Sequence, residues 1–290
     1  MSTEENQIEA QLIQVQAAML ECLKDTNLSK LIPENKNILG SGKMLRSQLV
    51  LALGAVNGIP EKESINAAAA VDMIHGASLL HDDVIDGGMI RRGAPTFWKK
   101  YGINGAILFG DVLMFKALSL LVDVNRVDLL SELIDRTGEV CRSEVEQELI
   151  LRGSPGTWEE CMLVGRYKTG SLFAFAAVAG GNKEPEQAAA LREAGYILGT
   201  AYQLADDVLD ASGNEEVSGK TLGTDDQRGK TTAITAKENA PEDPIAFIFH
   251  LLEKAANLLK PWPEIHTAWD TFLKVTMVPV LEKHVHASVE

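Results

Sequence analysis

The sequence has few cysteines, no excess of positive charge and no long uninterrupted hydrophobic run. Its three cysteines, Cys22, Cys141 and Cys161, are an odd number and lack the spacing of metal ligands, so we expect thiols in a reducing compartment. The 27 Lys and Arg residues against 41 Asp and Glu residues give a net charge of −14, which argues against nucleic acid as a main partner. No apolar run approaches the roughly 18 to 20 residues of a membrane-spanning helix, and the polar start Met1–Ala10 lacks signal-peptide features. We therefore expect a cytoplasmic protein with no transmembrane segment.

What the sequence does contain is helical patterning. Apolar residues recur every three or four positions in stretches rich in Ala, Leu and Met, which favour helix. We predict helices over 5–24, 43–57, 62–86, 104–122, 127–151, 158–180 and 185–211. No alternating strand pattern is evident, and short connections favour antiparallel neighbours. The sequence thus predicts an all-α, antiparallel helical bundle forming a single domain over residues 1–290, with one long polar, glycine-rich loop at 212–232.

Two aspartate clusters interrupt otherwise apolar helices. The first, at 79–86, places Asp82 and Asp86 one helical turn apart, with His75 two turns earlier on the same stripe. The second, at 203–210, places Gln203, Asp207 and Asp210 on one face, with Asp206 at its edge. Each has the pattern Asp-Asp-x-x-Asp.

Carboxylates one turn apart repel each other and are costly to bury, and a bound divalent cation removes both problems. Mg²⁺ prefers oxygen ligands and commonly combines one or two carboxylates with substrate phosphates. A solvated acidic helix end is the alternative for either cluster alone, but two such clusters favour a metal site.

Basic residues lie next to glycines near both clusters. They are found at 42–46, at Arg91-Arg92, at Lys168-Thr169, and at Lys220 and Lys230 in the long loop. A diphosphate requires Lys or Arg on the oxygens that Mg²⁺ leaves open. Taken alone, each of these Lys or Arg residues would be interpreted as a solvated surface charge.

Together these motifs resemble the trans-isoprenyl diphosphate synthases, or polyprenyl synthetases. The family's two aspartate-rich motifs match 82–86 and 203–210, its Gly-Lys-x-x-Arg-Pro motif matches Gly42–Arg46, and its Lys-Thr pair matches Lys168-Thr169. Ser47 stands where proline is usual, and Asp226 where leucine is common. The resemblance covers residues 42–231 and implies the isoprenoid synthase fold around a central active-site cavity, in a homodimer.

The resemblance also implies Mg²⁺-dependent, head-to-tail condensation of isopentenyl diphosphate with an allylic prenyl diphosphate. It assigns catalytic roles to Asp82, Asp86, Lys168, Asp206 and Lys220, and metal binding to Asp82, Asp86 and Asp206, with Asp83 and Asp210 on metal-bound water or just outside the ligands. The allylic diphosphate would contact Arg91, Lys168, Thr169, Gln203, Lys220 and Lys230. Isopentenyl diphosphate would contact Lys43, Arg46, His75 and Arg92.

Product length depends on the helical turn before the first cluster. In the family a bulky aromatic residue there stops elongation early, whereas Ala77 and Ser78 are both small. A product above four isoprene units is therefore expected. A geranylgeranyl or farnesyl diphosphate synthase remains an alternative, because small residues at these positions could instead permit close helix packing.

Two more distant functions also use such motifs. A terpene cyclase would ionise a prenyl diphosphate with one aspartate cluster, but it would not need the second-substrate residues. A non-catalytic synthase subunit usually loses the aspartates or lysines, and both sets are present here.

Overall fold

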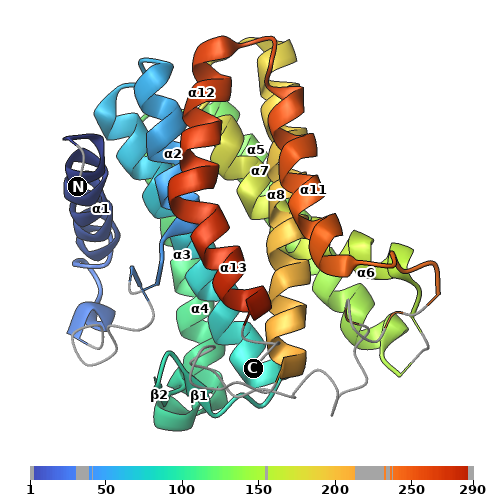
Figure 1. Cartoon of the computed structure of the whole chain (residues 1–290). Helices are drawn as coiled ribbons and strands as arrows, with labels where there is room; N and C mark the ends of the chain where they lie inside the picture. Colours follow the sequence, from blue (N-terminus) through green and yellow to red (C-terminus); the bar gives the residue numbers. More distant parts are fainter. Residues whose placement is uncertain are drawn as a thin grey trace. The chain divides into compact units, whose positions relative to one another are not determined.

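The computed structural model describes residues 3–30, 39–40, 42–153, 156–212, 232, 236 and 238–286, and these are almost entirely helical (Figure 1). The predicted all-α fold is confirmed. The long elements are α1 (Thr3–Glu21), α2 (Leu45–Val56), α3 (Glu61–Ile85), α4 (Phe97–Asp123), α5 (Val127–Glu146), α6 (Trp158–Val164), α7 (Ser171–Ala179), α8 (Pro185–Ser212), α11 (Pro244–Leu258), α12 (Pro263–Phe272) and α13 (Val278–His286). Short π-helical segments, η2 (Gln147–Leu151), η3 (Gly165–Gly170) and η4 (Leu273–Met277), lie between some of these helices, and a 3₁₀ turn, η1 (Asn27–Lys30), follows α1.

The chain divides into two compact units. One comprises Met1–Ile134 with Phe175–Lys183, and the other Asp135–Ala174 with Glu184–Glu290. The organisation of residues 1–290 as a single domain stays a prediction.

In the first unit, α3 packs against α1, α2 and α4, and lies beside α4 (Figure 1). Four consecutive alanines, Ala67–Ala70, are fully buried in α3, and their small side chains let neighbouring helices approach closely. A short antiparallel hairpin, β1 (Ile90–Arg91) and β2 (Ala94–Pro95), follows α3. Its turn residues Arg92 (φ 52°) and Gly93 (φ 73°) adopt the left-handed conformation that tight hairpins require. The hairpin therefore places Arg91 and Arg92 directly after the first aspartate cluster.

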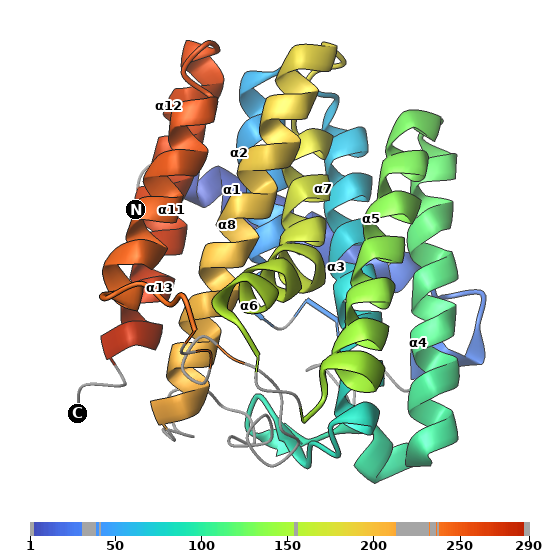
Figure 2. The ribbon, with the colours of Figure 1, turned by 90° about the vertical axis from the view of Figure 1, so that its right-hand side faces the viewer.

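In the second unit, α8 packs against η3, α11 and α13, and Figure 2 shows α8 beside α11. Glycines set the closest approach. A Cβ on Gly199 would lie 2.5 Å from Gly170 Cα, and one on Gly195 would lie 2.5 Å from Ala174 Cα. The backbone of η3 and the start of α7 thus rests directly on α8, which brings the lysine-threonine pair and the second aspartate cluster into one unit.

The predicted helix boundaries agree with the structure to within a few residues, but several features were not predicted. The helix expected over 104–122 is joined, across a kink at Gly102 with φ 81°, to a further helical stretch that begins at Phe97. The helices predicted over 127–151 and 158–180 each contain a π-helical segment, and the hairpin after α3 was not predicted. Most of the loop expected at 212–232 lies outside the described residues.

Helix α4 is long and apolar enough, by length and composition, to span a membrane, which the sequence prediction did not anticipate. About 39% of its most apolar window is buried inside the protein. A packed core helix meets the same criteria, so this is weak evidence of a membrane span.

Candidate active site

The first aspartate cluster lies at the C-terminal end of α3, as predicted. Asp82 and Asp86 are partly exposed and one turn apart, whereas Asp83 is buried. His81 points toward α4, with its Nε2 atom 3.1 Å from the carbonyl oxygen of Ile107. The two outer carboxylates are therefore accessible to a ligand.

Asp83 is paired with an arginine of the hairpin. The Nε and Nη2 atoms of Arg91 donate hydrogen bonds to Asp83 Oδ1 at 2.9 and 2.8 Å. Burial raises the pKa of Asp83, and the hydrogen bond and charge of Arg91 oppose that rise. This pair anchors the hairpin to α3 and engages an arginine predicted to contact the allylic diphosphate.

The residues predicted to bind isopentenyl diphosphate belong to the same unit. Burial, and then the positive charges of Arg46, Arg92 and Arg91, holds the pKa of His75 well below its ordinary value. The guanidinium of Arg92 lies beside Gly42, where a Cβ would be 2.5 Å from Nη2. The cations and His75 thus share one neighbourhood that suits an anion. Lys43 is exposed next to it.

Ser47, at the position where the family usually has proline, lies in the first turn of α2 and not in a loop. Its hydroxyl contacts the buried carboxylate of Asp72 on α3. Desolvation raises the pKa of Asp72, and Ser47, Arg46 and Arg92 oppose the rise. Asp72 was not singled out from the sequence.

The two chain-length residues lie one turn before the first cluster. Ala77 is fully buried, and Ser78 is partly exposed, with its hydroxyl donating to the carbonyl oxygen of His75 at 2.8 Å. No bulky side chain occupies either position.

In the second unit, a chain of hydrogen bonds joins two predicted motifs. Thr169 Oγ1 donates to Gln203 Oε1 at 2.5 Å, and Gln203 Nε2 donates to Asp207 Oδ1 at 2.8 Å. The thiol of Cys161 contacts the other oxygen of Asp207 at 3.8 Å. Burial and the nearby carboxylate of Asp207 raise the pKa of Cys161. The structure thus connects the lysine-threonine pair to the second aspartate cluster.

Lys168 lies between two α5–η2 side chains that sequence reasoning missed. Its ammonium is 2.5 Å from Glu144 Oε1 and 3.3 Å from Gln147 Oε1. Glu144 and Gln147 are three residues apart and so lie on one helical face, but their distance in sequence from Lys168 gives no signal of the pairing.

The C-terminal helix contributes a second unpredicted neighbour. Buried His284 on α13 has its Nδ1 atom 4.0 Å from Asp206 Oδ1, and its ring lies 5.6 Å from that of Tyr202. Asp206 keeps a partly exposed side chain, whereas Asp207 and Asp210 are buried. Among the three aspartates of this cluster, Asp206 is therefore the most accessible of the predicted metal ligands.

The carboxylate oxygens of the two aspartate clusters are ligands of the type that Mg²⁺ prefers. Within the described part of the chain, no group of three His, Cys, Asp or Glu side chains is arranged to hold a metal ion by itself. Mg²⁺ usually takes only one or two carboxylates and completes its shell with waters and substrate phosphates. The accessible pair Asp82 and Asp86, and Asp206 in the other unit, fit such partial coordination.

Two predicted ligands could not be placed. Lys220 and Lys230 lie outside the described residues, as does the variant position Asp226.

Comparison with known proteins gives consistent results. Residues 30–257 match the family model described as polyprenyl synthetase. The chain is 36% identical over 200 residues to an octaprenyl diphosphate synthase of Haemophilus influenzae, covering 67% of this chain and 60% of that relative. It is 35% identical over 230 residues to a geranylgeranyl diphosphate synthase of Methanosarcina mazei, covering 76% and 71%. The chain thus spans only about three fifths of the octaprenyl synthase's length.

A solved structure is similar over nearly the whole chain. The polyprenyl synthase of Caulobacter crescentus, crystallised with calcium and isoprenyl diphosphate, aligns with a TM-score of 0.73 at 27% identity, covering 98% of this chain and 94% of that one.

Proposed function

Because this chain belongs to the polyprenyl synthetase family, we propose that it is a prenyltransferase that condenses isopentenyl diphosphate head-to-tail with an allylic prenyl diphosphate. The observation that carries the proposal is the hydrogen-bond chain from Thr169 through Gln203 to Asp207, which joins two motifs that the reaction needs together. The Caulobacter relative crystallised with isoprenyl diphosphate supports this substrate class.

The reaction begins with loss of the allylic diphosphate. The bond between the allylic carbon and the diphosphate oxygen breaks, and its electron pair leaves with the diphosphate. Mg²⁺, held by Asp82, Asp86 and Asp206, would supply positive charge that stabilises this leaving group. The same diphosphate would receive cationic and hydrogen-bonding groups from six predicted ligands, namely Arg91, Lys168, Thr169, Gln203, Lys220 and Lys230.

The second substrate binds among the cations of the first unit. Arg46, Arg92 and Lys43 provide positive charge for the isopentenyl diphosphate, and His75, kept neutral by burial and nearby arginines, offers a hydrogen bond without adding charge. The double bond of isopentenyl diphosphate then forms the new carbon–carbon bond, and a proton is lost to the released diphosphate.

The product is longer than four isoprene units. This rests on the small residues Ala77 and Ser78 and on the octaprenyl diphosphate synthase among the relatives. A shorter product is the second candidate, because the Methanosarcina relative is named a geranylgeranyl diphosphate synthase.

Incubation with Mg²⁺, isopentenyl diphosphate and dimethylallyl, geranyl or farnesyl diphosphate tests the proposal, with chain length determined by mass spectrometry. Turnover should stop on chelation with EDTA and return with Mg²⁺. Conversion of farnesyl diphosphate alone to a hydrocarbon would instead establish a terpene cyclase, and no turnover by the purified chain would favour a non-catalytic subunit.

Asp82→Ala and Asp206→Ala should each lower kcat by about 10²-fold or more, since each removes charge needed in the transition state. If both clusters serve one diphosphate, the double variant should lose far less than the product of the single losses. Asp123→Ala, which removes an exposed carboxylate at the end of α4, is the matched control. Unchanged rates in either cluster variant would refute the site.

We further propose a homodimer formed through α4. Leu108, Phe115 and Val122 recur at seven-residue intervals along α4 and are 63%, 73% and 59% exposed. Light scattering should give twice the 31.4 kDa chain mass. Phe115→Asp should give the monomer, whereas Leu149→Asp, at an equally exposed site on η2, should not.

We propose that the enzyme acts in the cytoplasm, in line with its three free cysteines. A fluorescent fusion that followed the membrane fraction would contradict this.

A further inference from the structure

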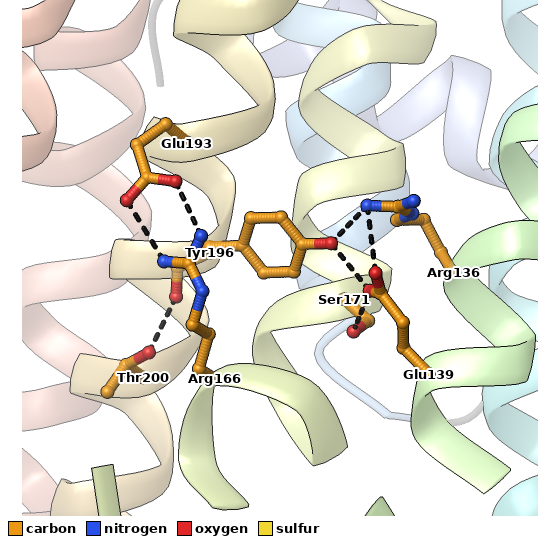
Figure 3. Close-up of polar contacts among 7 residues, drawn as sticks. All are labelled: Arg136, Glu139, Arg166, Ser171, Glu193, Tyr196 and Thr200. Carbon is orange, nitrogen blue, oxygen red and sulfur yellow. Dashed lines mark hydrogen bonds and ion pairs between the residues drawn. The ribbon is translucent and has the colours of Figure 1, made fainter. Parts of the chain in front are cut away.

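The π-helical segment η3 carries Lys168 and Thr169, and its two ends are held by one polar network (Figure 3). Arg166 lies near the start of η3, and Ser171 follows its end directly. Both residues reach side chains grouped around Tyr196 of α8. π-helical turns are rare and often mark functional sites, so what stabilises this one matters.

At the start of η3, Arg166 is held by a carboxylate and an aromatic ring. Its two terminal nitrogens donate to the two oxygens of Glu193 at 2.9 and 2.6 Å. Its guanidinium carbon lies 4.1 Å from the centroid of the Tyr196 ring, within cation–π range (Figure 3). The ring of Tyr167 meets Tyr196 edge-on, with centroids 6.2 Å apart.

At the end of η3, the same tyrosine acts through its hydroxyl. Tyr196 donates to Glu139 Oε2 at 2.5 Å, and Ser171 Oγ donates to the same oxygen at 2.8 Å. Arg136 contacts both the Tyr196 hydroxyl and Glu139. Burial, and the hydrogen bond to Glu139, raise the pKa of Tyr196, so the hydroxyl keeps its proton as the donor.

The backbone of η3 leaves little space for adjustment on the α8 side. A Cβ on Gly170 would lie 2.8 Å from the carbonyl oxygen of Tyr196, so this turn is packed against the residue that organises the network. Tyr196 therefore contacts η3 through its ring and its backbone. Its hydroxyl shares the Glu139 oxygen with Ser171, the residue that directly follows η3.

We propose that Tyr196 is a positioning residue: by holding Arg166 through its ring and Ser171 through Glu139, it fixes η3 so that Lys168 and Thr169 are presented to the allylic diphosphate. This inference rests on the proposed function, which assigns that ligand to Lys168 and Thr169. The remaining members of the network are not expected to touch substrate.

Tyr196→Phe is the first test, because it removes the hydroxyl and keeps the ring over Arg166. The KM for the allylic diphosphate should rise about 10-fold, the scale of a lost hydrogen bond to a charged group, while the KM for isopentenyl diphosphate stays at the wild-type value. Tyr101→Phe on α4 makes the same chemical change in the other unit and should leave both constants unchanged. Glu139→Gln should reproduce the pattern of Tyr196→Phe.

A double-mutant cycle separates positioning from general damage. If Tyr196 acts through Lys168, adding Tyr196→Phe to Lys168→Ala should lower kcat/KM for the allylic diphosphate only slightly further. Adding Tyr196→Phe to Arg46→Gln should instead multiply the fold-losses in kcat/KM of the two single variants. Equal losses for both substrates, or full multiplication with Lys168→Ala, would overturn the inference.

A binding measurement keeps the inference testable apart from turnover. Titration calorimetry with inorganic pyrophosphate and Mg²⁺ should show about 10-fold weaker binding for Tyr196→Phe than for wild type. If wild type shows no turnover but this difference persists, the proposed reaction fails and the positioning role stands. Equal affinities overturn the positioning role, and no binding by wild type overturns both.

Discussion

The hydroxyl of Ser47 donates a 2.5 Å hydrogen bond to the carboxylate of Asp72, joining α2 to α3 in a buried site. The Ser47 Oγ atom also lies 3.1 Å from the carbonyl oxygen of Ala68. The positive charges of Arg46 and Arg92 act on the same carboxylate. The serine therefore takes part in a charged cluster beside the proposed second-substrate site.

Ser47→Ala should lower the free energy of unfolding by about 1–3 kcal/mol, since it takes a hydrogen bond from a buried carboxylate. Urea unfolding measures this. The loss should shrink in an Asp72→Asn background, where the acceptor carries no charge. Ser64→Ala, at a buried serine of α3, is the comparison variant, and a loss of unfolding free energy there as large as at Ser47 would argue against a specific bond.

The depressed pKa of His75 predicts a loss of stability in acid. The unfolded chain takes up a proton at this residue below the ordinary histidine pKa of about 6.5, whereas the folded chain resists protonation. The free energy of unfolding should therefore fall as pH decreases below that value, and His75→Gln should lose less over the same range. Urea unfolding at neutral and acidic pH tests this, and parallel profiles for the two proteins would contradict it.

Ala77→Phe should shorten the product, because it places a ring one turn before Asp82. Ala77 is fully buried, so the added volume should also cost about 1–3 kcal/mol of stability. A graded series of Val, Leu and Phe, with products sized by mass spectrometry, should show progressive shortening. Ser78→Ala should keep the wild-type length, and an unchanged length in Ala77→Phe would exclude this path for the growing chain.

Gly199→Ala should destabilise the second unit, because its Cβ would lie 2.5 Å from the backbone of Gly170. The expected cost is about 1–3 kcal/mol or more, since backbone atoms cannot move aside easily. Gly138→Ala on α5 is the matched control, since a Cβ there meets nothing within 4 Å. Alanine should stabilise that helix by about 0.5–1 kcal/mol. Thermal unfolding distinguishes the two, and similar shifts would contradict the close packing.

The helices were largely predictable because their evidence is local. Periodic apolar residues predicted a helix over 62–86, and α3 spans Glu61–Ile85. The π-helical turn at η3 was not predictable, since its contacts with Tyr196 join residues that are distant in sequence. Local patterns carry no information on such pairings.

The same contrast holds for the site. Spacing alone placed Asp82 and Asp86 together on α3, because a helix repeats every 3.6 residues. The contacts of Lys168 with Glu144 and of His284 with Asp206 depend on how separate helices pack, so the sequence pattern did not predict them. The aspartates were found as motifs, and their partners only as neighbours in space.

The ion pair of Lys168 with Glu144 has a consequence for ligand discrimination. An ammonium 2.5 Å from a carboxylate is already neutralised, so an incoming anion must compete with that carboxylate for it. Chloride or acetate, with a single negative charge, gains little from the exchange, whereas a multiply charged diphosphate gains much more. If Lys168 binds the diphosphate as proposed, the pairing should therefore favour multiply charged ligands over common monovalent anions.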